Sequence, residues 1–237
     1  MERENDIRPD VDQSKAFWSD IWSKDVKHNH EASWIKEVEK HVENVGKQSD
    51  IEVTLHSLQL QLRRVRKWKA CGPDKVHGYW LKGFTKLHPL MAAQVNECIS
   101  TGETPTWMTR GRTCLIIKDV KKGSDVTNFR PITCLPLMWK ILTGNVSESL
   151  YHHLESEKLL PEEQKGCRKQ SRGTKDELMI DKMVMKNCRR RLTNLFVAWI
   201  DYKRAYDMVP HSWILACLRM FKLADNIHNL IEKSMNA

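Results

Sequence analysis

The stretch NLFVAWIDYKRAYDMVP, residues 194–210, decides how the fold of this chain is interpreted. It is apolar and aromatic up to Ile200, and Asp201 follows directly. Residues 195–201 therefore predict a buried strand that ends in a carboxylate. In such a partly dry place a carboxylate is costly unless it holds a cation or accepts several hydrogen bonds. Asp201 is thus either a metal ligand or catalytic acid, or a structural carboxylate held by hydrogen bonds.

A second acid, Asp207, follows six residues later but is not an obvious partner for the first. On a helix six residues turn by about 600°, which separates the two side chains by about 120°. They could share a face only if the whole segment were extended, and DYKRAYD has no strand pattern after Asp201. Lys203 and Asp207, four residues apart, more simply predict a surface ion pair.

Charge is distributed unevenly along the chain. The 237 residues carry 39 Lys plus Arg and 30 Asp plus Glu, a net charge of +9. Residues 1–55 hold 8 basic and 13 acidic side chains, which leaves a net charge of +14 for residues 56–237. A basic body of this kind suits a polyanion, most often nucleic acid, because each cation that meets a phosphate releases counterions. The alternative is a well-solvated surface without a partner.

Several classes of protein are disfavoured by the sequence. Seven cysteines form no CxxC pair, and an odd number fits no closed disulfide framework, so we expect reduced thiols in an intracellular protein. No apolar run approaches the roughly 20 residues of a membrane span, and the first residues are too polar for a signal peptide. The paired histidines at 28 and 30, and at 152 and 153, lack partners at zinc spacing.

Helical patterns dominate, with a few separated strands, which indicates an α+β fold. Residues 1–15 are charged and poor in large apolar groups, and this predicts a disordered tail. Residues 16–66 predict a helical extension, in which Trp18 and Trp22 share one helical face.

The middle of the chain predicts a hairpin between helices. Ser49 and Glu52 have the spacing of a capping box before a helix. Residues 111–137 contain two apolar, β-branched stretches around a charged loop with a glycine, which predicts a hairpin with a cationic tip. Helices are predicted from about 137 to 160, and from 174 to about 187.

A basic and aromatic segment, residues 61–86, is a candidate path for nucleic acid. It holds eight Lys or Arg and one Asp, interleaved with Trp68, Tyr79, Trp80 and Phe84. Rings that stack on bases among cations that neutralise phosphates are typical of such paths, although amphipathic helices with basic outer faces look similar. The candidate contacts are Arg63, Arg64, Arg66, Lys67, Lys69 and Lys75.

Four stretches in order resemble reverse transcriptases of non-LTR (LINE-type) retrotransposons. VAWIDYKRAYDMVP resembles their first palm motif, and WKACGPDKVHGYWLK their N-terminal block. LIIKDVKKGSDVTNFRPITCLPLMWKIL resembles the fingers hairpin, and LLPEEQKGCRKQSRGTKDEL the block before the palm strand. The resemblance covers about residues 60–222. It implies a partial right-hand polymerase, with fingers over residues 67–193 and the start of the palm over residues 194–237.

The resemblance also implies roles for individual residues. Asp201 would bind two Mg²⁺ ions, and the backbone carbonyl of Tyr202 would complete one shell. Tyr206 would stack under the deoxyribose and exclude a 2′-hydroxyl, although it could also be an ordinary half-buried tyrosine. Lys118 and Arg130 would grip the incoming triphosphate, and Lys121 and Lys122 are alternatives to Lys118. The family block that contains Gln164, Gly166 and Arg168 is expected near the template.

By this resemblance the complete enzyme is an RNA-directed DNA polymerase. It would transfer deoxynucleotides from their triphosphates to a primer 3′-hydroxyl, using an RNA template and a DNA primer or target DNA, in the nucleus and without a membrane partner. The family takes its further carboxylates from an aromatic-x-Asp-Asp motif, and these 237 residues contain no Asp-Asp pair. We therefore expect a truncated chain, without thumb or endonuclease, that is inactive alone. Asn145, where the family favours an apolar residue, fits drift in a decaying copy. The alternatives are a non-catalytic nucleic-acid-binding remnant or a reused helical interaction protein.

Overall fold

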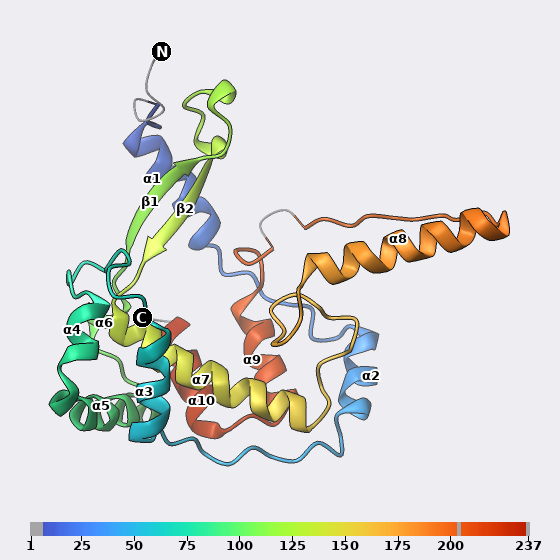
Figure 1. Ribbon diagram of the computed structural model, residues 1–237. Coiled ribbons are helices and arrows are strands. Elements are labelled where there is room, and N and C mark those ends of the chain that lie inside the picture. The colour runs from blue at the N-terminus through green and yellow to red at the C-terminus, as the bar shows by residue number, and fades with distance from the viewer. Residues whose placement is uncertain (1–6, 203–204, 236–237) are drawn as a thin grey trace.

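The computed structural model describes residues 7–202 and 205–235, which are mostly helical with one two-stranded antiparallel sheet (Figure 1). The helices are α1 (Val11–Trp22), α2 (Ser33–His41), α3 (Leu55–Arg64), α4 (Gly78–Gly83), α5 (His88–Thr101), α6 (Thr106–Thr109), α7 (Leu137–Ser156), α8 (Thr174–Arg191), α9 (His211–Met220) and α10 (Asp225–Met235). The strands are β1 (Arg112–Ile117) and β2 (Phe129–Cys134), and short 3₁₀ turns lie at η2 (Thr85–Leu87), η3 (Val120–Lys122) and η4 (Val126–Asn128).

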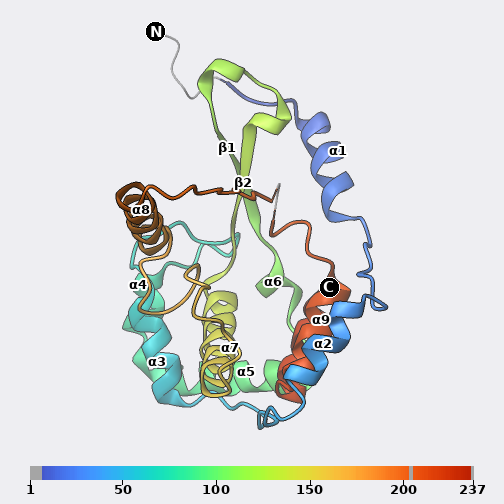
Figure 2. The ribbon, with the colours of Figure 1, turned by 90° about the vertical axis from the view of Figure 1, so that its right-hand side faces the viewer.

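The core lies in a helical base built from α3, α5, α7 and α10 (Figures 1 and 2). Apolar residues on α5 recur at steps of three and four, so they form one stripe along the helix, and this stripe packs against the neighbouring helices. Each fully buried aliphatic side chain contributes about 1.5–3 kcal/mol to folding. The apolar side chains of this core with no more than 1% exposure are Leu58, Val95, Ile99, Ile141, Leu142, Ala224 and Ile227.

The predicted hairpin is confirmed and stands on this base. β1 and β2 pair in antiparallel register from Arg112 with Cys134 to Ile117 with Phe129. An isolated two-stranded hairpin is marginally stable in water, so it needs support from other elements. Phe129 is buried, and α1 lies against the η4 turn near the tip (Figure 1).

The CGPD turn, residues 71–74, requires a glycine at position 72 because the backbone of another segment lies very close to it. A Cβ atom at this position would lie 2.5 Å from the backbone nitrogen of Pro136 and 2.8 Å from the carbonyl carbon of Leu135. Only a residue without a side chain allows so close an approach to backbone. The turn therefore packs directly against the point where β2 leads into α7.

The N-terminal segment, residues 22–53, is fastened to α9 and α10. The backbone N–H of His28 donates to Ser212 Oγ at 3.0 Å, and the rings of Trp34 and Trp213 meet at 5.1 Å. Further along, Lys47 pairs with Asp225 at 2.6 Å. Figure 2 shows α2 beside α9. The predicted helical extension is thus packed against the chain that follows Asp201.

Two sequence predictions about the N-terminal part are wrong. Residues 11–15 of the predicted disordered tail are helical, because Asp10 caps α1 by accepting from the backbone N–H of Gln13 at 2.8 Å; residues 1–6 lie outside the described residues. The capping box at Ser49 does not form either. α3 begins at Leu55, and Thr54 is the cap, accepting from the N–H of Ser57 at 3.1 Å.

The buried strand predicted for residues 195–201 is also absent from the structure. The segment is not in a sheet and is exposed, with Phe196 at 93% and Ile200 at 80%. A strand needs a neighbour to pair its backbone N–H and C=O groups, and among the described residues the only strands, β1 and β2, pair with each other. The preceding helix α8 has no buried residue and projects from the body (Figure 1).

Two further features of the described residues concern disulfides and membrane-spanning helices. None of the seven cysteines, all of which lie in the described ranges, forms a disulfide. Within those ranges no helix combines the length and the apolar character needed to cross a bilayer.

Candidate functional site

Lys118 and Arg130 lie on one face of the hairpin. Arg130 is the strand partner of Ile116. The backbone N–H of Lys118 donates to the carbonyl of Asn128 at 2.7 Å, which extends the pairing by one residue. Side chains two apart on a strand, and those directly opposite, share a face. Both cationic side chains are exposed, so together they present an ammonium and a forked guanidinium to solvent.

The tip of the hairpin is closed by Asn128, which is 4% exposed. Its Nδ2 donates to the carbonyls of Asp119 at 2.7 Å and Gly123 at 2.9 Å, and its Oδ1 accepts from the N–H of Asp119 at 3.2 Å. The ammonium of Lys118 donates to the carbonyl of Thr127 at 2.7 Å. The cationic tip is therefore a defined loop whose shape depends on one buried amide.

A second turn completes the tip. The N–H of Thr127 donates to Asp125 Oδ1 at 2.7 Å, and its hydroxyl donates to the same oxygen. These bonds to the charged form lower the pKa of Asp125 below its usual 3.8. Lys121 and Lys122, the alternatives to Lys118, are exposed in the η3 turn.

Asp201 and Tyr202 are exposed at the end of the extended segment. Among the described residues no group of three or more His, Cys, Asp or Glu side chains could hold a metal ion. Mg²⁺ takes oxygen ligands in near-octahedral geometry and gives up its water reluctantly. One exposed carboxylate does not meet that requirement, so the described residues do not by themselves form the Mg²⁺ site that the resemblance implies.

Tyr206 is 88% exposed and contacts the block before the palm segment. Its hydroxyl lies 3.9 Å from Cys167 Sγ, and this hydrogen bond raises the pKa of the Tyr206 phenol above its usual 10.0. The half-buried tyrosine considered from the sequence is therefore not what the structure has. The predicted pair between Lys203 and Asp207 falls partly outside the described residues, because Lys203 is not among them.

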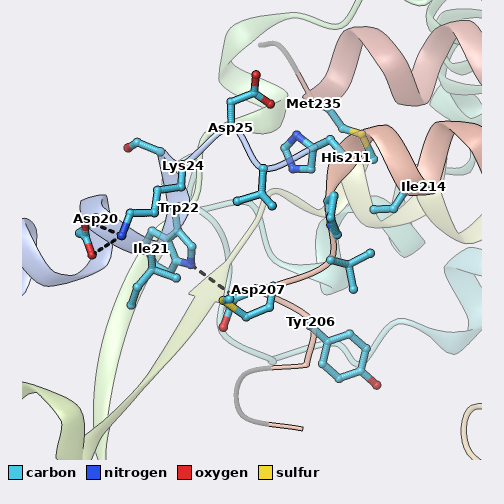
Figure 3. A pocket seen from close by; sticks show the side chains of 15 residues that line it. Asp20, Ile21, Trp22, Lys24, Asp25, Tyr206, Asp207, His211, Ile214 and Met235 are labelled. Carbon is cyan, nitrogen blue, oxygen red and sulfur yellow. Dashed lines mark hydrogen bonds and ion pairs between the residues drawn. The ribbon is translucent and has the colours of Figure 1, made fainter. Parts of the chain in front are cut away.

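Asp207 bonds instead to the N-terminal helix. Trp22 Nε1 donates to Asp207 Oδ1 at 3.2 Å. The contact crosses a pocket of about 700 Å³ between residues 20–26 and residues 206–211 (Figure 3). Figure 3 shows the indole of Trp22 directed at Asp207, and the ring of Tyr206 turned away from them.

This pocket is not suited to a triphosphate. Its acidic members are Asp20, Asp25 and Asp207, and its lysine, Lys24, already pairs with Asp20 at 2.9 Å. An anion placed there would meet like charge, which disfavours its binding. The hairpin face, which carries two exposed cations, is the better anion site of the two.

The predicted site residues are therefore gathered only in part. Lys118 and Arg130 share a surface, and Tyr206 is joined to the block around Gly166 through Cys167. Figure 1 shows the extended segment after α8 ending apart from the hairpin. The structure thus holds the phosphate-binding candidates and Asp201 on separate elements.

The block around Gln164, Gly166 and Arg168 is fastened to α7. Gln164 Nε2 donates to the carbonyl of Gly166 at 3.1 Å. Arg168 pairs with Glu155 at 3.2 Å and donates to the carbonyl of Pro161 at 2.7 Å. Its charge is thus already engaged within the chain.

Glu148 joins three parts of the structure. It accepts from Lys169 in this block and from Arg64 Nη1 at 2.9 Å at the end of α3. Hydrogen bonds from Lys169 and then from Arg64 lower the pKa of Glu148 below its usual 4.5. A carboxyl group with a lowered folded-state pKa stabilises the fold above its unfolded pKa and loses that contribution as the pH falls through the folded value.

We expect Glu148→Gln to destabilise the chain slightly at pH 7, by less than about 1 kcal/mol because the ion pairs are partly exposed. The difference from the unsubstituted chain should shrink as the pH falls below 4.5. Thermal unfolding followed by circular dichroism between pH 7 and pH 3.5 measures it. Glu163→Gln, at an exposed position, is the control. Equal destabilisation by Glu148→Gln at both ends of this range would contradict the assignment.

The basic segment offers exposed cations outside these networks. Arg64 is paired with Glu148, whereas the other five candidates are exposed and make no ion pair within 4 Å in the part of the chain that the structure describes. These are Arg63, Arg66, Lys67, Lys69 and Lys75. They keep their charge available for a polyanion.

Sequence reasoning missed three residues that shape the site: Asn128, Trp22 and Glu148. Asn128 follows a polar loop and precedes a strand, the position at which an Asn side chain commonly bonds to nearby backbone. The sequence therefore contained a local signal for the role of Asn128. The hydrogen bond from Trp22 to Asp207 joins residues 185 positions apart, and no local sequence pattern predicts such a contact.

The comparison with known proteins agrees with the resemblance that the sequence motifs indicated. Residues 120–237 match the family described as reverse transcriptase (RNA-dependent DNA polymerase). Over 173 residues, 73% of the chain, the sequence is 27% identical to the Retrovirus-related Pol polyprotein from type-1 retrotransposable element R2 of Popillia japonica. The matched part is 23% of that protein, so the chain spans about a quarter of the length of this relative. Residues 120–237 therefore carry a reverse transcriptase domain, and the chain is similar to the enzymes of non-LTR retrotransposons.

Proposed function

We propose that this chain forms the nucleotide-binding fingers and the first palm carboxylate of an RNA-directed DNA polymerase. The observation that carries the proposal is the hairpin, whose Lys118 and Arg130 share one exposed face beside a tip closed by Asn128. The family match over residues 120–237 supports the same reading.

In the proposed reaction the 3′-hydroxyl of a primer attacks the α-phosphorus of a deoxynucleoside triphosphate. A phosphodiester bond forms, the bond to the β-phosphate breaks, and pyrophosphate leaves. Lys118 and Arg130 would hold the triphosphate oxygens, because an ammonium supplies point charge and a guanidinium supplies two parallel donors. The partners would be an RNA template and a DNA primer or target DNA.

Asp201 and the carbonyl of Tyr202 would be this chain's ligands to the two Mg²⁺ ions of the complete enzyme. Because the described residues offer no further carboxylate to that site, we expect a polypeptide of these 237 residues alone not to extend a primer. A longer polypeptide that contains them and carries an Asp-Asp motif is the proper object for assays of activity.

Tyr206 tests the proposed substrate. In such a polypeptide, Tyr206→Ala should lower the preference for deoxynucleotides over ribonucleotides by roughly 10- to 200-fold, because it removes the ring that would exclude a 2′-hydroxyl. Steady-state kcat/KM for the two nucleotides measures the preference. Tyr206→Phe keeps the ring, loses the contact with Cys167, and should keep the preference. If Tyr206→Ala discriminates as well as the unsubstituted enzyme, the nucleotide site is elsewhere.

A further inference from the structure

Helix α8 carries an exposed apolar surface on the part of the molecule that projects from the body (Figure 1). It is 18 residues long, and none of its residues is buried. Helices in proteins gain most of their stability by packing an apolar face against a neighbour, and an isolated helix of this length is marginal in water. The helix therefore has the surface of an element that packs against a partner.

One side of α8 is lined by the chain that follows it. The N–H of Thr193 donates to the carbonyl of Cys188 at 3.1 Å, which turns the chain back along the helix. Residues 192–195 line a shallow pocket together with Met185, Cys188 and Arg189 of the helix. A second chain must therefore approach α8 from another side.

The open side of α8 forms a stripe along the helix, which we call the α8 stripe. Its members are Ile180, Met183, Val184 and Asn187, which follow the spacing i, i+3, i+4 and i+7 of a single helical face. The exposed fractions are 52% for Ile180, 69% for Met183 and 43% for Val184. At about 100° per residue, Met183 lies nearly opposite Met185, which lines the pocket. A continuous exposed apolar surface of this kind marks a site of interaction.

Charge is divided between the two halves of α8. Residues 174–181 hold three acids and one lysine, whereas residues 182–191 hold five Lys or Arg and no acid. This order agrees with the helix dipole, which favours acids in the first turn and cations in the last. Within the described ranges, no charged side chain of α8 makes an ion pair within 4 Å. Both charged ends are thus available to a partner.

A second copy of α8 in antiparallel orientation matches both the stripe and the charges. The α8 stripe is centred midway between the two charged ends, so a copy turned end for end brings the two stripes together. Asp176 and Glu177 of each copy then lie beside the last two arginines of the other. A parallel pair would set the basic halves against each other, and like charges in contact disfavour that orientation.

The same features disfavour other partners for an exposed apolar helix. An anionic membrane surface or a nucleic acid would meet the acids of residues 174–181 as like charges, and a nucleic acid would leave the apolar stripe unused. A second copy supplies apolar surface and both signs of charge at matching positions. We propose that the chain forms a dimer through antiparallel pairing of α8 across a two-fold axis, with the same patch on both subunits. The proposal does not depend on polymerase activity.

Sedimentation equilibrium of the 237-residue chain tests the dimer. Two helices of this length bury less than a standard interface, so the average mass should rise from that of one chain toward that of two between about 2 and 200 μM. Met183→Glu places a charge at the centre of the apolar contact and should weaken the dimer by about 10-fold or more. Leu178→Glu is the matched control, because it makes the same kind of change at a side chain of α8 that is 51% exposed and lies outside the stripe.

Three outcomes would overturn the proposal. The first is a chain that stays monomeric over the whole concentration range. The second is equal weakening of the dimer by Met183→Glu and Leu178→Glu. The third is a dimer that survives Met183→Glu and is lost in Phe196→Ser, because the contact would then lie in the extended segment after α8.

Charge reversal tests the antiparallel register. Glu177→Lys and Arg191→Glu should each weaken the dimer roughly 3- to 10-fold, because each creates two like-charge contacts per dimer. The double variant Glu177→Lys/Arg191→Glu restores opposite charges between the copies, so its dimer should be within about 2-fold of the unsubstituted one. A double variant that dimerises no better than either single variant, with unchanged helix content by circular dichroism, would exclude this register. Nucleotides take no part in these measurements, so their outcome is separate from that of the proposed polymerase function.

Discussion

Asp201→Asn, in a polypeptide that extends a primer, is expected to lower the rate of nucleotide incorporation by about 10²- to 10³-fold or more. The substitution keeps the shape of the side chain and removes its charge. The loss should appear in kcat, because a charged metal ligand matters most where negative charge develops in the transition state. Asp201 is exposed, so folding should be unaffected.

Asp207→Asn provides the matched control for this experiment. It removes the same charge six residues further on, from an exposed side chain that accepts a hydrogen bond from Trp22. An amide oxygen can still accept that bond, so incorporation should change little. Single-turnover incorporation on an RNA template with a DNA primer measures both variants. Comparable losses in the two would show that Asp201 has no special part in the chemistry.

Local patterns in the sequence predicted the hairpin and several of the helices. The β-branched stretches around the charged loop became β1 and β2, and the helix predicted from about 137 to 160 became α7. Such patterns work because the contacts that they describe lie within a few residues of each other. Cap positions were less certain, since Thr54 has the same capping chemistry as Ser49 and lies closer to the apolar stripe.

The strand before Asp201 could not be predicted by the same means. An apolar run indicates that a segment can be buried, but a strand forms only if a second strand pairs with it. In the described residues none does, and Phe196 and Ile200 remain exposed. The consequence for the site is direct, because the position of Asp201 depends on pairing that the local sequence does not contain.

The candidate site likewise has one part that depends on local sequence and another that depends on contacts between distant segments. The shared face of Lys118 and Arg130 follows from the register of the hairpin, whose two strands lie close together in the chain. The contacts of Tyr206 with Cys167 and of Asp207 with Trp22 join segments that are far apart in the chain. The N-terminal helices, which look like an appendage in the sequence, therefore help to hold the segment that follows Asp201.

Asn128→Ala is expected to have the largest effect among substitutions in the hairpin tip. It removes three hydrogen bonds from a buried amide and leaves the carbonyls of Asp119 and Gly123 without that partner. At about 1 kcal/mol for each bond, the closed tip should lose roughly 3 kcal/mol. Lys118 would then no longer be held beside Arg130, so the KM for deoxynucleotides should rise more than kcat falls.

Trypsin provides a direct measure of tip opening, because Lys121 and Lys122 are exposed there. In Asn128→Ala, cleavage at these two lysines should be faster by on the order of 100-fold, since 1.4 kcal/mol of lost local stability corresponds to a factor of ten. Ser124→Ala, in the same loop, is the control and should leave the rate unchanged. A tip that stays resistant in Asn128→Ala while the KM rises would mean that Asn128 meets the nucleotide itself rather than holding Lys118 in place.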